Sequence, residues 1–279
     1  AEGSVAVYFQ NNLQDIELSS SFYPTTGRPH GVATADYDED GFPDVAIVTG
    51  AAQSTLVFYN LGDGTFDRFI SHDSFNNLRA DYCVNGDFAA AGDIDIAANN
   101  GTVLFNQGGR QFTSGKFEIP GTGLVVDAGD IDGDGADDVL TATEDQQIVT
   151  VHHSDGQGGF ASPKNLSVNG RARAADLGDF NGDGLKDILV ANTSTAVITV
   201  FMNKGGLEFS DPLEISLIAA PRDVDSVDVD RDGHVDLVAV TPGFVVVVRN
   251  RGDGTFDSPA NYPSAVGGVP NDVVSADLN

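Results

Sequence analysis

The chain has 279 residues, of which 41% are hydrophobic, so it is long enough to bury a sizeable core. Its 42 acidic against 14 basic residues give a formal net charge of −28, which repels nucleic acid phosphates and excludes nucleic acid as a partner. No apolar run approaches the ~18 residues of a membrane-spanning helix, so we expect no membrane insertion.

The N-terminal segment AEGSV, residues 1–5, has the character of a mature end left by signal-peptidase cleavage, which favours secretion. The single cysteine, Cys83, lies in an apolar stretch, and we interpret it as a buried structural thiol.

Along the chain we expect a repeated unit made of short strands. The segment DYDEDGFPDVAIV begins at Asp36, and similar segments begin at Asp130, Asp179 and Asp228, the last three at a spacing of about 49 residues. A worn copy at Asp87 has alanines at its third and fifth places. After each of these loops comes an apolar strand, a Gly-rich turn and a Phe that we expect to wedge between repeats: Phe66, Phe112, Phe160, Phe209 and Phe256. Such repeats predict four-stranded blades of a β-propeller.

We therefore predict an all-β fold, a six-bladed β-propeller of four-stranded antiparallel blades, with seven blades as the alternative. The whole chain, 1–279, would be a single domain with blades near 28–72, 79–120, 122–169, 171–218, 222–263, and 268–279 plus 1–22. The last blade would be shared by the two termini. The equivalents of residues 231–240 are missing from it. Either the sequence lacks a segment or another strand fills the slot, which leaves a homo-oligomer through the incomplete blade open.

The recurring motif D-x-[DN]-x-D-G-x-x-D, followed by a strand, resembles the FG-GAP/VCBS repeat family over essentially the whole chain. That family includes the integrin α-chain propeller and the calcium-containing propeller lectins of mushrooms. The resemblance implies a metal-binding propeller, and the lectins imply carbohydrate as the ligand.

The four intact loops place oxygens at places one, three, five and nine and a backbone carbonyl at place seven, which suits Ca²⁺. Gly at place six supplies the sharp turn. We expect about four Ca²⁺ ions in a structural role and an empty Asp87 loop. Because extracellular calcium modules bind at about 10⁻⁴–10⁻³ M, such loops would fill outside cells, which again predicts a secreted protein. The predicted ligands are Asp36, Asp38, Asp40, Phe42, Asp44, Asp130, Asp132, Asp134, Ala136, Asp138, Asp179, Asn181, Asp183, Leu185, Asp187, Asp228, Asp230, Asp232, His234 and Asp236.

Basic residues gather just before the first strands of several repeats, where a propeller would bring them to its central axis. Arg binds carboxylates and sulfates through its fork of donors, so we hypothesise a site for an anionic glycan group. The alternative is that these residues pair with local acids. The candidate ligand-binding residues are Arg28, His30, Arg79, Arg171, Arg173 and Arg222.

Two adjacent histidines, His152 and His153, end a predicted strand, and we do not interpret them as a two-His metal site. No nucleophile–base pattern or nucleotide motif is present, and blades account for the whole chain.

The leading prediction is a secreted, lectin-like protein that binds a glycan or glycoprotein. The alternatives are a polysaccharide lyase-type enzyme on the same scaffold and an integrin-like adhesion module.

Overall fold

The computed structural model describes residues 3–9, 19–50, 54–73, 80–117, 124–264, 270 and 272–275. These are all-β apart from one turn of 3₁₀ helix, Glu144–Gln146. Among them, no helix has the length and apolarity to cross a membrane. The chain divides into two compact units, the first comprising Ala1–Glu118, Asp155–Gly159 and Asp277–Asn279, and the second Ile119–Ser154 and Phe160–Ala276.

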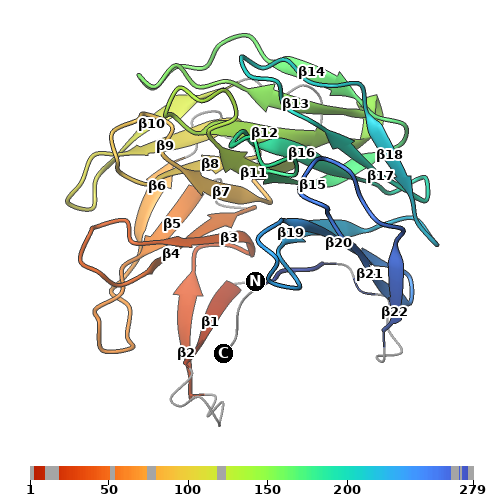
Figure 1. The fold of residues 1–279 in the computed structure, drawn as a ribbon. Coiled ribbons are helices and arrows are strands. Elements are labelled where there is room, and N and C mark those ends of the chain that lie inside the picture. The colour runs from red at the N-terminus through yellow and green to blue at the C-terminus, as the bar shows by residue number, and fades with distance from the viewer. Residues whose placement is uncertain are drawn as a thin grey trace. The chain divides into compact units, whose positions relative to one another are not determined.

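The first unit holds two four-stranded antiparallel sheets and one pair of strands (Figure 1). The pair is β1 (Gly3–Phe9) and β2 (Ser19–Thr25). In each four-stranded sheet, strands adjacent in sequence are adjacent in the sheet. Their bounds are β3 (Pro29–Ala35), β4 (Asp44–Thr49), β5 (Ser54–Phe58), β6 (Ile70–Asp73), β7 (Cys83–Gly86), β8 (Asp95–Ala98), β9 (Thr102–Asn106) and β10 (Phe112–Lys116).

The second unit holds three further four-stranded sheets with the same meander order (Figure 1). Their strands are β11 (Leu124–Gly129), β12 (Asp138–Thr143), β13 (Ile148–His152), β14 (Lys164–Ser167), β15 (Ala172–Gly178), β16 (Asp187–Asn192), β17 (Val197–Phe201), β18 (Leu213–Ser216), β19 (Asp223–Val227), β20 (Asp236–Thr241), β21 (Phe244–Val248) and β22 (Ala260–Pro263).

The apolar runs that follow the acidic loops become the second strands of the sheets. Strands β12, β16 and β20 are buried along their whole length, because sheet neighbours flank them and side chains pack on both faces. The fourth strands, such as β18 and β22, are largely exposed. The predicted all-β class with four-stranded antiparallel sheets is confirmed, whereas the six-blade count and the single-domain division stay predictions.

For the fifth repeat the sequence predicts strands over 225–229, 236–240, 244–250 and 256–262, and the structure differs from this prediction at both edges of the sheet. Its first strand was expected over 225–229, but β19 ends at Val227, because the Asp228 side chain turns to accept loop N–H groups. The fourth strand was expected over 256–262. The regular strand β22 begins only at Ala260, and Phe256 forms a single bridge with Asn250, as Phe66 does with Asn60 in the first sheet.

The recurring Phe packs against the sheet before it, as expected for a wedge. In the second unit, the rings of Phe256 and Phe180 meet edge to face with centroids 6.2 Å apart. In the first unit, Phe112 meets Tyr37 in the same way at 6.1 Å. Cys83 is buried in that unit's core, and burial raises its pKa to about 12, which fits an unreactive thiol.

Candidate functional site

The acidic loops are held in shape by their first carboxylate. Its two oxygens accept N–H groups from the loop, including that of the place-six Gly, as Asp179 does from Gly182 at 2.7 Å and Gly184 at 2.8 Å. The place-six glycines have positive φ, for example 87° at Gly184. The place-five carboxylates in turn accept the N–H of place seven at 2.8–2.9 Å, which anchors the backbone of the residue whose own carbonyl is a predicted ligand. These are the pairs Asp40 with Phe42, Asp134 with Ala136, Asp183 with Leu185 and Asp232 with His234.

The ninth-place carboxylate connects the loop to the sheet. Asp187, fully buried at the start of β16, accepts N–H groups from Phe180 at 2.8 Å and from Asn203 at 2.7 Å. It therefore ties the loop start and the end of the third strand to the second strand. The same pair of bonds recurs in each intact loop, at Asp44, Asp138 and Asp236.

Burial raises the pKa of these carboxyls, and the N–H bonds offset only part of the rise. The pKa reaches about 6 in Asp44, Asp138 and Asp187.

The worn loop at Asp87 shows that this architecture does not need the acids at places three and five. Asp87 still accepts N–H groups from Ala91 at 2.9 Å and Gly92 at 2.7 Å. Asp95 still accepts them from Phe88 at 3.0 Å and Asn106 at 2.7 Å, and burial raises its pKa to about 7. The carboxylates at places one and nine thus have a structural role in addition to any role in binding an ion. This loop has alanines in place of the carboxylates at places three and five.

Several loops bring carboxylates close enough to hold a metal ion. The oxygens of each such group lie within 4.8 Å of one another. In the first loop, the Asp38 side chain is 7% exposed and its Oδ1 has no hydrogen-bond partner, so a cation would satisfy a buried lone pair there. The fourth loop has Asn181 at place three, and its Nδ2 donates to Asp183 at 2.9 Å. The carboxylate groups are Asp36, Asp38 and Asp40; Asp130, Asp132 and Asp134; and Asp228, Asp230 and Asp236.

Basic side chains reach the place-three carboxylate in three of the four loops, a feature that the sequence reading missed. Arg110 Nε lies 2.7 Å from Asp38 Oδ2, although 72 residues separate them. His153 Nδ1 lies 3.1 Å from Asp132 Oδ2. In the last loop, Arg249 pairs with Asp230. His153 and Arg249 occupy the same place in their repeats, directly before the residue that bridges to the recurring Phe, whereas Arg110 comes from the turn between β9 and β10 of another sheet.

Asparagines that connect neighbouring sheets were also missed. Asn250 Nδ2 donates to the carbonyls of Phe180 at 2.8 Å, in the preceding sheet, and Val235 at 2.9 Å, in its own loop. The equivalent bonds link Asn203 to Ile131 and Lys186, and Asn106 to Tyr37 and Ile94. The signal was present, because Asn recurs just before the Gly-rich turn in most repeats.

The candidate ligand-binding basic residues lie near local acids. In the second unit, Arg171 and Arg173 both approach Glu144, at 3.8 and 3.9 Å, while half of each side chain stays exposed. In the first unit, His30 Nδ1 lies 3.0 Å from Asp81. Arg28 and Arg222 precede β3 and β19, and Arg79 lies outside the described residues. Binding of an anion by these residues stays a prediction.

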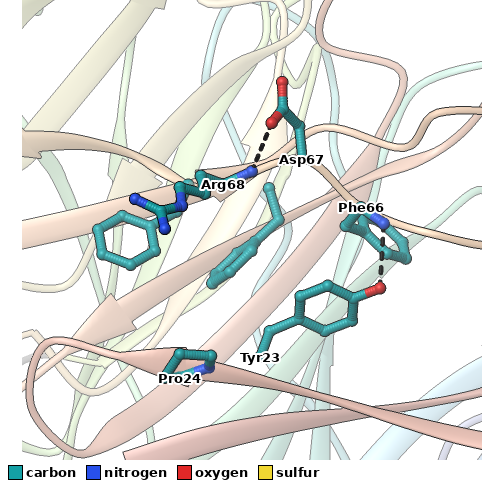
Figure 2. A pocket seen from close by; sticks show the side chains of 7 residues that line it. Tyr23, Pro24, Phe66, Asp67 and Arg68 are labelled. Carbon is teal, nitrogen blue, oxygen red and sulfur yellow. Dashed lines mark hydrogen bonds between the residues drawn. The ribbon is translucent and has the colours of Figure 1, made fainter.

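A pocket of about 650 Å³ opens in the first unit, between β2 and the β3–β6 sheet (Figure 2). The ring of Tyr23 meets those of Phe58 and Phe66 edge to face, with centroids 5.9 and 5.6 Å apart. Tyr23 Oη also accepts the N–H of Phe66 at 3.0 Å, which fixes the ring. The full lining is Tyr23, Pro24, Phe58, Phe66, Asp67, Arg68 and Phe69. Sequence reasoning did not find this pocket, because its residues come from two separate parts of the chain.

Repeated four-stranded sheets with an acidic loop between the first and second strands define a repeat protein of the β-propeller class. The chain belongs to the FG-GAP-like repeat family, whose model matches residues 130–190, 179–239 and 228–279 and so covers just over half of the chain. A search of the curated proteins gave no match.

Solved propeller structures share the fold. One is an Agrocybe aegerita lectin described as recognising non-reducing terminal N-acetylglucosamine, with a TM-score of 0.63, 19% identity, and coverage of 82% of this chain and 65% of that one. This chain therefore spans less than two thirds of the lectin's length. A functionally unknown protein from Desulfotomaculum acetoxidans has a TM-score of 0.67 and 13% identity, covering 94% and 77%. An inactive virginiamycin B lyase from Staphylococcus aureus has a TM-score of 0.56 and 12% identity, covering 97% and 76%.

Proposed function

We propose that this chain is a carbohydrate-binding protein on an FG-GAP propeller, stabilised by calcium and working outside cells. The observation that carries the proposal is the aromatic pocket of the first unit, and the lectin among its structural neighbours supports it.

The pocket offers both kinds of contact that a sugar ring needs. The C–H faces of a pyranose pack on aromatic rings, which Tyr23, Phe66 and Phe69 supply. Its hydroxyls need hydrogen-bond partners, and the lining includes the Arg68 guanidinium as a donor and the Asp67 carboxylate, which also accepts the Arg68 N–H at 2.7 Å (Figure 2), as an acceptor. A volume of about 650 Å³ is within the usual range for small ligands. Arg68 would also favour an acidic sugar or a sulfate.

Calcium is the ion that the loops suit best, because the donors are carboxylate, amide and carbonyl oxygens. In each of the four intact loops, the side-chain oxygens at places one, three, five and nine and the carbonyl at place seven would hold the calcium ion. All of these side chains are carboxylates except the amide of Asn181. The bound ion would cancel repulsion between the acids and tie the first strand to the second. In the worn loop only Asp87 and Asp95 remain of these carboxylates, so we propose that it stays empty.

A glycan array probed with the purified chain in about 5 mM calcium and again in chelator tests the proposal. We expect binding to a restricted set of glycans in calcium. Arg68→Ser, which copies Ser258 at the equivalent place of the fifth repeat, and Tyr23→Ala should each weaken that binding at least about tenfold. The matched control is Arg251→Ser, which removes an exposed arginine from a turn of the second unit.

No glycan bound in calcium would overturn the proposed function. Binding that survives both pocket variants but is lost in an Arg171→Ala/Arg173→Ala double variant would move the site to the basic residues of the second unit. A product absorbing in the ultraviolet after incubation with uronate polymers would instead favour the lyase-type alternative.

A further inference from the structure

The loop that begins at Asp130 contains an imidazole beside its carboxylates. His153 Nδ1 lies 3.1 Å from Asp132 Oδ2 and 3.2 Å from Asp138 Oδ1. The donor atoms of these three residues all lie within 4.8 Å of one another. Among the described residues, this is the one group of possible metal ligands that includes a nitrogen donor.

The other repeats place different side chains where His153 stands. The position precedes the bridge to the recurring Phe, and its occupants elsewhere include Tyr59, Met202 and Arg249. Arg249 also pairs with the place-three carboxylate of its own loop. However, an arginine stays protonated and has no lone pair, so it can only neutralise a carboxylate. A neutral imidazole can bind a metal directly.

The three donors are held in place before any metal arrives. Asp138 is fully buried, and its two oxygens accept N–H groups from Ile131 at 3.1 Å and Ser154 at 2.8 Å. The neighbouring His152 is buried and bonds Thr141 Oγ1 at 2.9 Å, which anchors the end of β13. The side chains of Asp132 and His153 are 15% and 23% exposed, so the group is closed on one side and open to solvent on the other.

We propose that the loop beginning at Asp130 binds a borderline divalent metal such as Zn²⁺ through Asp132, Asp138 and His153. Imidazole with carboxylates suits Zn²⁺ and Co²⁺, whereas Ca²⁺ takes oxygen ligands. Two carboxylates and a neutral imidazole balance the charge of one divalent ion, and water would complete the coordination. Because Asp132 and Asp138 are also the proposed calcium ligands, the two metals would exclude each other in this loop alone. The site does not depend on glycan binding.

Co²⁺ is a suitable probe, because the intensity and position of its visible bands report its coordination number and change when a ligand is lost, and Zn²⁺ can be followed by calorimetry. We expect one equivalent of either metal to bind the metal-stripped chain, and millimolar calcium to compete with it. His153→Met, the residue of the following repeat, should weaken Zn²⁺ binding at least about tenfold and remove the Co²⁺ signal. Its calcium stoichiometry, measured by elemental analysis, should not change.

His234→Met is the matched control, because that imidazole is exposed and in no such group of ligands, and the substitution keeps the backbone carbonyl through which residue 234 is a proposed calcium ligand. It should leave Zn²⁺ binding unchanged. Zn²⁺ binding that is absent in the wild type, or equally strong in His153→Met, would overturn the proposal. So would equal weakening of Zn²⁺ and Ca²⁺ in His153→Met, since that result would show that His153 only orients the carboxylates. Asp132→Asn keeps the size of the side chain and removes its charge. It should weaken Zn²⁺ binding while the variant remains folded, which separates loss of a ligand from loss of the fold.

Discussion

Removing the ninth-place carboxylate from the worn loop separates its structural role from any role in metal binding. Asp95→Ala leaves the buried N–H groups of Phe88 and Asn106 without an acceptor. Each orphaned donor costs about 1–3 kcal/mol, so the free energy of unfolding should fall by about 2–6 kcal/mol. Asp95→Asn keeps one acceptor oxygen and should cost about half as much.

Urea denaturation at about pH 8.5, above the pKa of about 7 of Asp95, measures this cost with the carboxylate ionised. The loss should be the same in calcium and in chelator. Asp187→Ala, in an intact loop, should cost more in calcium than in chelator, because it also removes a proposed ligand. The control Asp211→Asn removes an exposed acid and should change little. An Asp95→Ala cost that vanishes in chelator, or stays below about 1 kcal/mol, would refute the structural role.

Three further predictions address the links between sheets, proton binding and the ions. Asn250→Leu should lower the free energy of unfolding by about 2–6 kcal/mol in urea, because it strips the donor from two carbonyls; an unchanged midpoint would contradict this. Burial and the neighbouring Asp176 raise the pKa of Asp127 from 3.8 to about 8. The folded state thus binds the proton more tightly, and stability should fall as pH rises from about 4 through 8. Asp127→Asn should flatten that fall in thermal melts, and parallel pH profiles would count against it. Chelation should remove about 1.4–2.7 kcal/mol per filled loop relative to 10 mM calcium, if each binds at about 10⁻⁴–10⁻³ M. Calorimetry checks the value, and a melting temperature insensitive to chelator would argue against structural calcium.

The repeat made the sheets predictable, because Asp at place one and Gly at place six fix a turn, and an apolar run follows it. The strand edges were less predictable. Residues 256–259 were predicted as part of the fourth strand, but the structure has only the Phe256 bridge there and begins β22 at Ala260.

The motif did not predict which side chains contact the loops. Arg110 reaches Asp38 from the turn of another sheet, and no local spacing announces that pair. His153 and Arg249 share a place in the repeat, but the side chains at that place differ from repeat to repeat, so only the fold shows that both contact the place-three carboxylate of their own loops. In contrast, the recurring Asn before each turn was visible in the sequence, and only its two acceptors required the structure.

The worn loop shows how such a protein can change over time. Since Asp87 and Asp95 hold the turn without help from their neighbours, mutations at places three and five can accumulate there with little penalty to folding. An ancestral repeat could lose its ion first and keep its shape, which frees the turn between its strands to acquire a different task.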